Sequence, residues 1–270
     1  MTLRKVGFEA RARAAAAAGF RGLGWRREDF GDGGTEAVEA GVKLLSELNL
    51  EATELEFLRS WLGRDQDPAY QEAERQLWAT ANRFGTKRVS VADFEPGEPE
   101  LLQSGLKGLC RRAAEFGLTV QLEFMPYTPP VESLGAAWQL LQLVDEPNCG
   151  LLIDAWHWFR AAGSGEALRQ VPADRITGVQ LGDGPSAAAA ELEDESRHHR
   201  LVPGGGEFDL VGLLRLLAEH GVRAPLSVEV MSDELDDLSP ETAARLVADG
   251  TKEVLKVAGH GGRPGDIIQL

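Results

Sequence analysis

The sequence predicts an α/β fold with a parallel sheet, because seven short apolar runs alternate with about eight helix-forming runs along its 270 residues. The strand-like segments are apolar runs rather than alternations of apolar and polar residues, which is typical of strands covered on both faces. No G-x-G-x-x-G or phosphate-loop pattern follows the first run. A (β/α)8 TIM barrel is therefore favoured over a doubly wound, nucleotide-binding sheet.

The first half of the chain supplies three of the predicted strands. Residues 8–18 are a strong helix-forming run, and Gly19 stands in the position expected just past a helix end. Strands are predicted at 21–26, 51–58 and 87–93. Helices with one apolar stripe are predicted between and after them, at 35–48, 67–84 and 99–116.

The second half repeats the alternation and leaves one strand in question. Strands are predicted at 118–124, 150–154, 176–183 and 225–231, and helices at 133–144, 166–170, 209–220 and 240–258. A barrel needs an eighth strand, and the only candidate is the stub TLRKV at 2–6, so the first strand is expected to be short or incomplete. We expect a single TIM-barrel domain over 1–258 and a flexible, Gly-rich C-terminal tail over 259–270.

Composition excludes several classes of protein. The formal net charge of -15 argues against nucleic-acid binding, which needs clustered Lys and Arg. No run approaches the ~18 apolar residues of a membrane span, and no secretory signal is visible at the N-terminus. The two cysteines, Cys110 and Cys149, match no metal or disulfide spacing, which fits a reducing compartment. We expect a cytoplasmic protein without nucleic-acid or membrane partners.

Polar residues end four of the later predicted strands. They are Glu123, Asp154, Gln180 and Glu229. In a barrel the carboxyl ends of the strands meet at one face, so these side chains should converge there. Three carboxylates brought together repel one another unless a cation neutralises them. An all-oxygen set suits Mn²⁺ or Mg²⁺, with Co²⁺ or Zn²⁺ as alternatives, although zinc usually recruits His or Cys.

A set of linked motifs carries a resemblance to a known family. In chain order they are Glu123 and the segments IDAWH (153–157), VQLGDG (179–184), RHHRLVPGGGE (197–207) and SVEV (227–230). This order resembles the xylose-isomerase-like TIM barrels of the sugar phosphate isomerase/epimerase superfamily (AP endonuclease family 2-like). The resemblance implies that Glu123, Asp154, Gln180 and Glu229 are metal ligands. It also implies that His157, in the D-x-x-H motif, contacts the substrate.

Two departures from the family pattern bear on function. Many relatives carry His where this chain has Gln180, but some dehydratase-type members, related to 3-dehydroshikimate dehydratases, use Gln there. Relatives often read P-G-E-G where this chain has Pro203-Gly204-Gly205-Gly206, so one acidic group of that loop is absent. Gln180 thus favours a dehydratase somewhat.

Further residues are candidates for binding the substrate. His198, His199 and Arg200, in the run RHHR, form a polar cluster in a long loop that could clamp the substrate, with Arg200 pairing with a carboxylate, phosphate or ketone oxygen. Trp156 could form an apolar wall against a sugar or cyclitol ring, or it could pack in the core. Residues 186–196 before the cluster are expected to be exposed and mobile. Asp183 could support the metal ligands or cap a turn.

The resemblance implies a divalent-metal-dependent isomerase or epimerase. It would act on a sugar, keto-sugar or cyclitol by proton abstraction next to a carbonyl, through a metal-stabilised enediolate. Glu123 and Glu229 would serve as base and acid, with His157 as a further catalytic group. The alternative is a metal-dependent dehydratase (a lyase) of the 3-dehydroshikimate or keto-inositol type, which would take a keto acid or cyclitol. A further alternative is a non-catalytic ligand-binding member, and a homodimer is expected by analogy.

Overall fold

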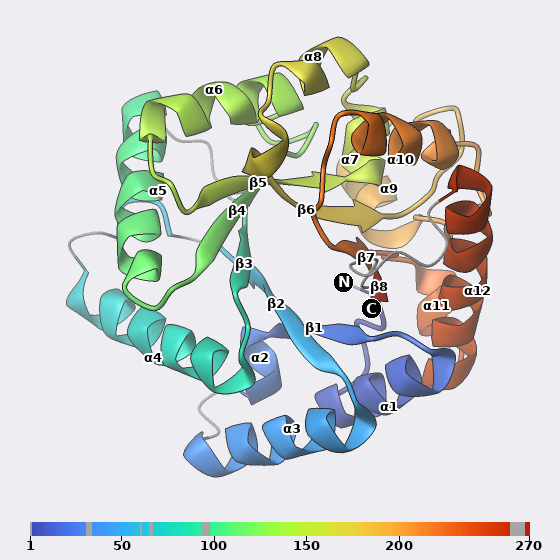
Figure 1. Cartoon of the computed structure of the whole chain (residues 1–270), viewed down its shortest axis with the longest axis horizontal. Coiled ribbons are helices and arrows are strands. Elements are labelled where there is room, and N and C mark those ends of the chain that lie inside the picture. The colour runs from blue at the N-terminus through green and yellow to red at the C-terminus, as the bar shows by residue number, and fades with distance from the viewer. Residues whose placement is uncertain (1, 31–33, 60, 65–66, 93–97, 260–267) are drawn as a thin grey trace.

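Eight parallel strands close into a barrel, so the (β/α)8 prediction is confirmed (Figure 1). The computed structural model describes residues 2–30, 34–59, 61–64, 67–92, 98–259 and 268–270. In chain order the strands are β1 (Gly22–Arg26), β2 (Glu51–Leu58), β3 (Arg88–Val91), β4 (Thr119–Glu123), β5 (Cys149–Asp154), β6 (Ile176–Leu181), β7 (Leu226–Val228) and β8 (Ile268–Gln269). The seven strands predicted from apolar runs are all present, with ends within three residues of the prediction.

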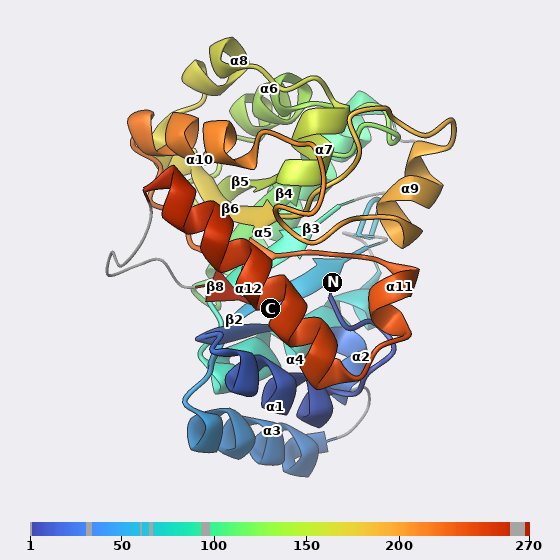
Figure 2. The same ribbon diagram turned by 90° about the vertical axis from the view of Figure 1, so that its right-hand side faces the viewer.

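The helices form a ring around the strands, as Figures 1 and 2 show. Eight of the described helices match the predicted ranges within two residues: α1 (Phe8–Ala18), α3 (Gly34–Leu48), α4 (Pro68–Phe84), α5 (Pro99–Ala114), α6 (Leu134–Val144), α8 (Gly165–Arg169), α10 (Leu210–Glu219) and α12 (Pro240–Ala258). Four short helices were not expected: α2 (Arg27–Phe30), α7 (Ala155–Arg160), α9 (Leu192–His198) and α11 (Asp233–Asp236). Each of these has seven residues or fewer, so a helical apolar pattern has little length in which to show, although the equally short α8 was predicted.

Local chemistry explains why the longer helices begin and end where they do. The Asp67 side chain accepts hydrogen bonds from the backbone N–H groups of Ala69 and Tyr70, and Pro68 occupies the first helical position of α4. Gly85 ends the same helix with φ 74°, a left-handed conformation that glycine adopts without strain. Similar glycines end α1 and α12.

The eighth strand does not come from the N-terminus, so the prediction for residues 2–6 is wrong. Leu3 has φ 56°, and its carbonyl accepts a hydrogen bond from Val6 N–H, so this stretch turns. Closure comes instead from Ile268–Gln269, which pairs with both β1 and β7. Leu270 exchanges backbone hydrogen bonds with Gly22 and Gly24. A two-residue strand is too short to produce a detectable apolar pattern.

The predicted tail, residues 259–270, can be followed only in part. Residues 260–267 lie outside the described residues, while Ile268 and Gln269 belong to the barrel sheet. The domain boundary at 258 therefore stays a prediction. In the part of the chain that the structure describes, no helix is long and apolar enough to cross a membrane.

The barrel interior contains polar groups below its active end. Glu54 on β2 accepts hydrogen bonds from Ser90 Oγ at 3.1 Å and from Gln121 Nε2 at 2.6 Å. All three side chains are buried. Because Gln121 and Glu123 lie two residues apart on β4, they point to the same side of the sheet. Glu123 therefore faces the interior one layer above this network.

Candidate metal centre and active site

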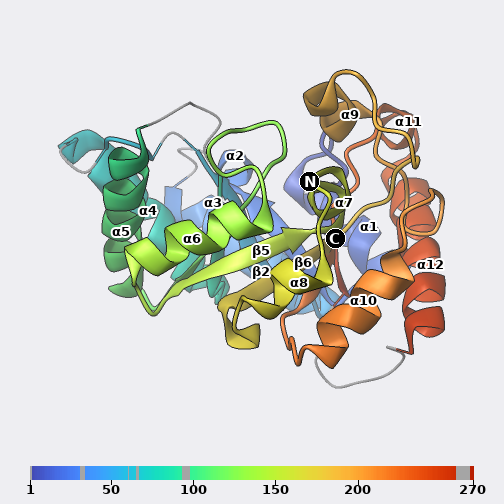
Figure 3. The same ribbon diagram turned by 90° about the horizontal axis from the view of Figure 1, so that it is seen from above.

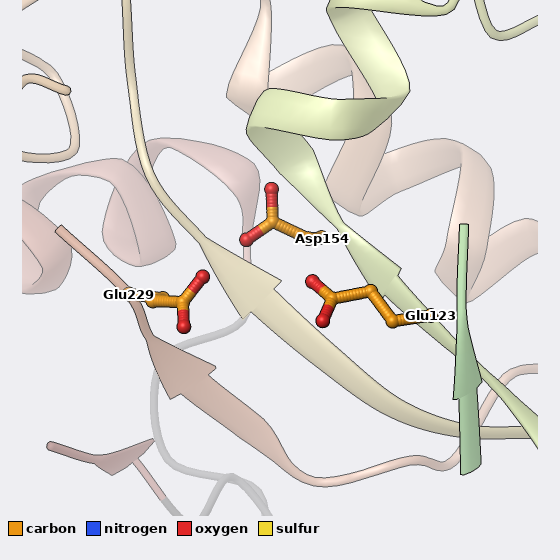
Figure 4. A group of neighbouring side chains, drawn as sticks. All are labelled: Glu123, Asp154 and Glu229. Atoms are coloured by element: carbon orange, nitrogen blue, oxygen red, sulfur yellow. The ribbon is translucent and has the colours of Figure 1, made fainter. Parts of the chain in front are cut away.

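Three buried carboxylates meet at the carboxyl ends of the strands. Glu123 is the last residue of β4, Asp154 is the last of β5, and Glu229 follows β7 directly. Figure 4 shows the three side chains pointing toward one another. One carboxylate oxygen from each lies within 4.8 Å of the others. The convergence expected from the strand ends is therefore present in the structure.

Gln180 lies beside this group. It is the partner of Asp154 in the parallel register of β5 and β6, so the two side chains project from the same side of the sheet. Gly178, two residues earlier, has the same orientation, and a Cβ added there would lie 2.8 Å from Gln121 Oε1 inside the barrel. Gln180 is buried, and its Oε1 has no hydrogen-bond partner among the described residues.

The electrostatics of the group favour a cation. Burial raises the pKa of Glu123 well above its ordinary value, and repulsion by Glu229 and Asp154 adds to this effect. The pKa of Asp154 is also raised, mainly by burial. Glu123 Oε1, like Gln180 Oε1, has no hydrogen-bond partner in the part of the chain that is described. Carboxylate and amide oxygens left without partners fit a hard divalent cation, which would remove the repulsion and complete their coordination.

Arg200 lies among these carboxylates. Its side chain is fully buried, and Nη1 donates to Asp154 Oδ2 at 2.8 Å and to Glu229 Oε2 at 2.9 Å. Burial opposes a charge on Glu229, but nearby positive charge, including that of Arg200, outweighs it and lowers the pKa of Glu229 to about 2. Arg200 therefore pairs with two predicted metal ligands, whereas the sequence pattern suggested a contact to the substrate.

His157 and Trp156 follow Asp154 in the short helix α7. Asp154 Oδ1 caps this helix by accepting a hydrogen bond from His157 N–H at 2.9 Å. The imidazole Nε2 lies 3.5 Å from Glu123 Oε1 and 3.4 Å from Arg200 Nη2. Burial, reinforced by Arg200, lowers the pKa of His157 well below its ordinary value, so the imidazole is neutral. His157 thus stands beside the carboxylates, and its contact to the substrate stays a prediction.

Trp156 and His199 are not brought to the cavity. Trp156 is fully buried and packs edge-on against His157, so it takes the core role that the sequence left open. The His199 side chain is 62% exposed and pairs with Asp194 at 3.3 Å. Its neighbour His198 lines the cavity instead. The two histidines are adjacent: His198 is the last residue of α9 and His199 follows it, so the end of this helix decides which one lines the cavity.

A cavity of about 220 Å³ opens above the carboxylates. Glu123, His157, Arg200 and Glu229 form part of its lining. Among the other described residues around it, those with polar or charged side chains are Arg4, Arg59, Tyr127, Arg197 and His198. Arg197 and His198 belong to the polar run RHHR that the sequence suggested as a substrate clamp, whereas Arg4, Arg59 and Tyr127 were not predicted as site residues. Arg59 offered the clearest sequence signal, because it directly follows the strand β2.

The family of the chain follows from a comparison with known sequences. A model of the xylose isomerase-like TIM barrel family matches residues 12–254. The chain belongs to this family. The resemblance drawn from the motifs is thereby confirmed.

Curated relatives within or near this barrel family are enzymes. The chain is 34% identical over 228 residues to a 3-dehydroshikimate dehydratase of Pseudomonas aeruginosa, a match that covers 82% of this chain and 35% of that protein. The chain thus spans about a third of the length of that relative. It is also 30% identical over 168 residues to an inosose isomerase of Halalkalibacterium halodurans, covering 58% of each.

A solved structure supports the fold. The crystal structure of the IOLI protein with a bound zinc atom superposes with a TM-score of 0.80 at 19% identity, covering 96% of this chain and 95% of that one. At this identity the likeness shows the barrel fold alone.

Proposed function

We propose that this xylose isomerase-like barrel is a divalent-metal-dependent dehydratase that acts on a cyclic keto acid of the 3-dehydroshikimate kind. The sequence favoured an isomerase or epimerase first and a dehydratase second. The charge of the cavity reverses that order. The cytoplasmic location and the homodimer stay predictions.

The cationic lining of the cavity is the observation that carries the proposal. Apart from the carboxylates Glu123 and Glu229, the described residues with basic side chains that line the cavity are Arg4, Arg59, Arg197, Arg200, His198 and the neutral His157. This is notable in a chain with a formal net charge of -15. Arg4 and His198 also pair with Asp233, Arg197 pairs with Glu193, and Arg200 pairs with Asp154 and Glu229, so a substrate carboxylate would share these groups with acids of the protein. A substrate carboxylate can form a bidentate ion pair with a guanidinium group, whereas a neutral sugar or cyclitol can only accept single hydrogen bonds from it. The Arg59 guanidinium lies 4.6 Å from the centre of the Phe57 ring, which holds it against the cavity wall.

The metal would be held by Glu123, Asp154, Gln180 and Glu229. When bound, it supplies a Lewis acid that polarises the ketone of the substrate and acidifies the neighbouring C–H bond. Glu229 then accepts the proton from this carbon, and the electron pair of the C–H bond forms an enediolate. The carbonyl would then re-form, a C=C bond would form between the α- and β-carbons, and the C–O bond to the β-hydroxyl would break, with hydroxide as the leaving group.

The departing hydroxyl needs a proton, which we assign to the pair of Glu123 and His157. The raised pKa of Glu123 belongs to the metal-free protein, and a bound metal would keep this carboxylate ionised. Their side chains lie 3.5 Å apart, and the neutral imidazole of His157 carries one N–H proton that it can hand on. Hydroxide therefore leaves as water. His157 stays neutral, so it can pass a proton between its two nitrogens without carrying a permanent charge.

An isomerase acting on an inosose is the second candidate. It is supported by the inosose isomerase that is 30% identical over 58% of this chain. The same carboxylates could abstract the proton, which would then return to a different carbon or face. The two candidates differ in whether water is lost.

The experiment compares both substrates on the same Mn²⁺-loaded protein. Loss of water from 3-dehydroshikimate gives an aromatic ring that is followed by ultraviolet absorbance, whereas inosose isomerisation is followed by NMR. We expect keto-acid turnover that falls by roughly 100-fold or more in Glu229→Gln. The matched control is Glu234→Gln, an exposed acid nearby, which should keep full activity.

A second variant tests the substrate charge. Arg59→Met should raise KM for the keto acid by roughly 10-fold or more, because it removes a charged partner of the carboxylate. Turnover of inosose but not of the keto acid, with KM insensitive to Arg59, would show that the isomerase candidate is right and the dehydratase is not.

A further inference from the structure

The helix α9 contains a buried acid that the proposed reaction does not use. Glu195 is 2% exposed, whereas the neighbouring acids Glu193 and Asp194 are exposed. The sequence predicted that residues 186–196 are an exposed segment whose acids are only solvated, and for Glu195 this is wrong. A buried carboxylate is costly unless hydrogen-bond donors and an opposite charge compensate it.

Glu195 finds these partners on the helix that carries His157. Its Oε1 accepts hydrogen bonds from Arg160 Nε at 2.8 Å and from Trp156 Nε1 at 3.2 Å, and Arg160 Nη2 completes a buried ion pair. Its Oε2 accepts from Ala189 N–H at 2.6 Å. Arg160 is itself held between aromatic rings, 5.6 Å from the centre of Trp156 and 4.8 Å from that of Phe208. Glu195 thus fastens α9 and the preceding loop onto α7.

The next residue along α9 holds Arg200. Arg200 Nε donates to the Ser196 carbonyl at 2.8 Å, and Nη2 donates to Ser196 Oγ at 2.9 Å. Tyr127 donates from its hydroxyl to the same Oγ at 3.3 Å. The remaining nitrogen of the fork, Nη1, reaches Asp154 and Glu229. Contacts therefore run without a break from Glu195 through Ser196 and Arg200 to two of the three carboxylates.

The position of Arg200 also sets the charge of the centre. One guanidinium and one divalent cation together balance three carboxylates, so the loaded centre is neutral. If Arg200 moved outward, the loaded centre would keep a net negative charge in a buried place, and Asp154 and Glu229 would lose the donor that orients them. Within α9, Ser196 provides the two hydrogen bonds that hold the Arg200 guanidinium in this buried position.

We propose that Glu195 is a positioning residue for the metal centre: it anchors α9 on α7, so that Ser196 fixes Arg200 between Asp154 and Glu229 with the geometry that the metal needs. The inference rests on the metal dependence within the proposed function, but not on the substrate or the reaction.

The test measures metal binding without any substrate. We compare wild type, Glu195→Gln and the control Glu193→Gln, an exposed acid two residues away that pairs with Arg197. Titration calorimetry with Mn²⁺ should give a dissociation constant roughly 10- to 100-fold weaker for Glu195→Gln and one within about twofold of wild type for the control. The visible spectrum of the Co²⁺-loaded protein should change for Glu195→Gln alone, since it reports ligand geometry.

A second variant guards against misfolding of the first. Arg160→Lys keeps the positive charge but removes the two-nitrogen contact to Glu195, and like Glu195→Gln it should weaken Mn²⁺ binding. The double variant should weaken Mn²⁺ binding no more than the more severe single variant does, because both changes break the same ion pair between Glu195 and Arg160. Faster hydrogen exchange over residues 186–199 with unchanged metal affinity and spectrum would overturn the proposal and leave Glu195 a merely structural anchor.

The two proposals fail in different ways. If Glu195→Gln weakens metal binding while the keto acid is not turned over, the positioning role stands and the dehydratase is wrong. If wild type binds no divalent metal, both proposals are overturned.

Discussion

Gln180 and Glu123 each bury an oxygen that has no hydrogen-bond partner among the described residues. Such atoms are costly in a protein interior, where polar groups are nearly always paired. Both oxygens lie at strand ends around one point of the barrel, which gives them a common explanation in a bound cation. At the scale of single residues, this is the observation that turns a cluster of acids into a candidate metal site.

Gln180 should matter for metal affinity more than for folding. We expect Gln180→Ala to weaken Mn²⁺ binding by roughly 10-fold or more, while Gln180→His, which supplies another ligand atom, keeps binding within about 10-fold of wild type. Titration calorimetry gives both constants, and thermal melts in EDTA check that the metal-free proteins are equally stable. Equal affinity of wild type and Gln180→Ala would remove Gln180 from the ligand set.

Glu54, below the metal group, should make stability depend on pH. Burial, with repulsion from Glu56, raises the pKa of Glu54 from its ordinary value to about 7. Because the folded state holds the proton more tightly than the unfolded chain, this contribution to stability is full below the ordinary carboxyl pKa and is lost as pH rises through 7. The Tm of metal-free wild type should therefore fall between about pH 5 and pH 8.

Glu54→Gln tests this directly. The amide keeps an oxygen for Ser90 and Gln121 but carries no charge, so we expect the fall in Tm to be smaller by a few degrees. Glu51→Gln, at the exposed start of the same strand, should keep the wild-type dependence. Parallel pH curves for wild type and Glu54→Gln, recorded by scanning fluorimetry, would contradict the assignment.

At the scale of elements, the loop after β6 is built around Asp183. This buried carboxylate accepts hydrogen bonds from the backbone N–H groups of Gly184, Gly204 and Phe208. The sequence left open whether Asp183 supports the metal or caps a turn, and these contacts show that it organises the loop. The glycines after Pro203 allow the backbone to approach the Asp183 carboxylate closely.

α9 and α11 flank the same end of the barrel, linked by a bridge between His199 and Ser232 (Figures 2 and 3).

Gly206 should be intolerant of any side chain. An added Cβ would lie 2.3 Å from Asp183 Oδ1 and 2.5 Å from the Gly184 carbonyl oxygen. We expect Gly206→Ala to destabilise the fold by about 1–3 kcal/mol, which lowers Tm by roughly 3–10 °C. The control is Gly135→Ala in α6, where a Cβ meets nothing closer than 3.9 Å and should be neutral or stabilising. A Gly206→Ala protein as stable as wild type would show that the loop can move aside.

At the scale of the whole molecule, the barrel brings together groups from distant parts of the sequence. Strands β4, β5 and β7 each provide one carboxylate, and β8 closes the sheet against β1 from the other end of the chain. Closing a sheet leaves no unpaired edge, so every strand end at the active face is held in place. The metal group is therefore tied to the integrity of the barrel as a whole.

Metal binding should consequently raise the stability of the whole protein. At a Mn²⁺ concentration about 100 times the dissociation constant, the gain is about 2.7 kcal/mol, or roughly 5–10 °C in Tm. Thermal melts in EDTA and in Mn²⁺ measure it, and Glu229→Gln should lose most of the shift. The same Tm in both solutions would contradict a metal centre of any kind.

The sequence by itself determined the alternation of strands and helices and the position of Glu123, Asp154, Gln180 and Glu229 at or near the ends of four strands. It could do so because apolar runs mark buried parallel strands, and the ends of parallel strands meet at one face whatever the details of packing. Both predictions therefore depend only on local sequence patterns and on the general geometry of a parallel barrel.

Only the tertiary structure decided which loop and terminal residues reach the centre. Arg200 turned inward to pair with two carboxylates, His198 lines the cavity while its neighbour His199 does not, and β8 closes the barrel where residues 2–6 were expected. Each depends on contacts between segments far apart in the sequence, such as Glu195 with Arg160, and no local pattern records them. Short segments without a repeating pattern take their conformation from what they pack against.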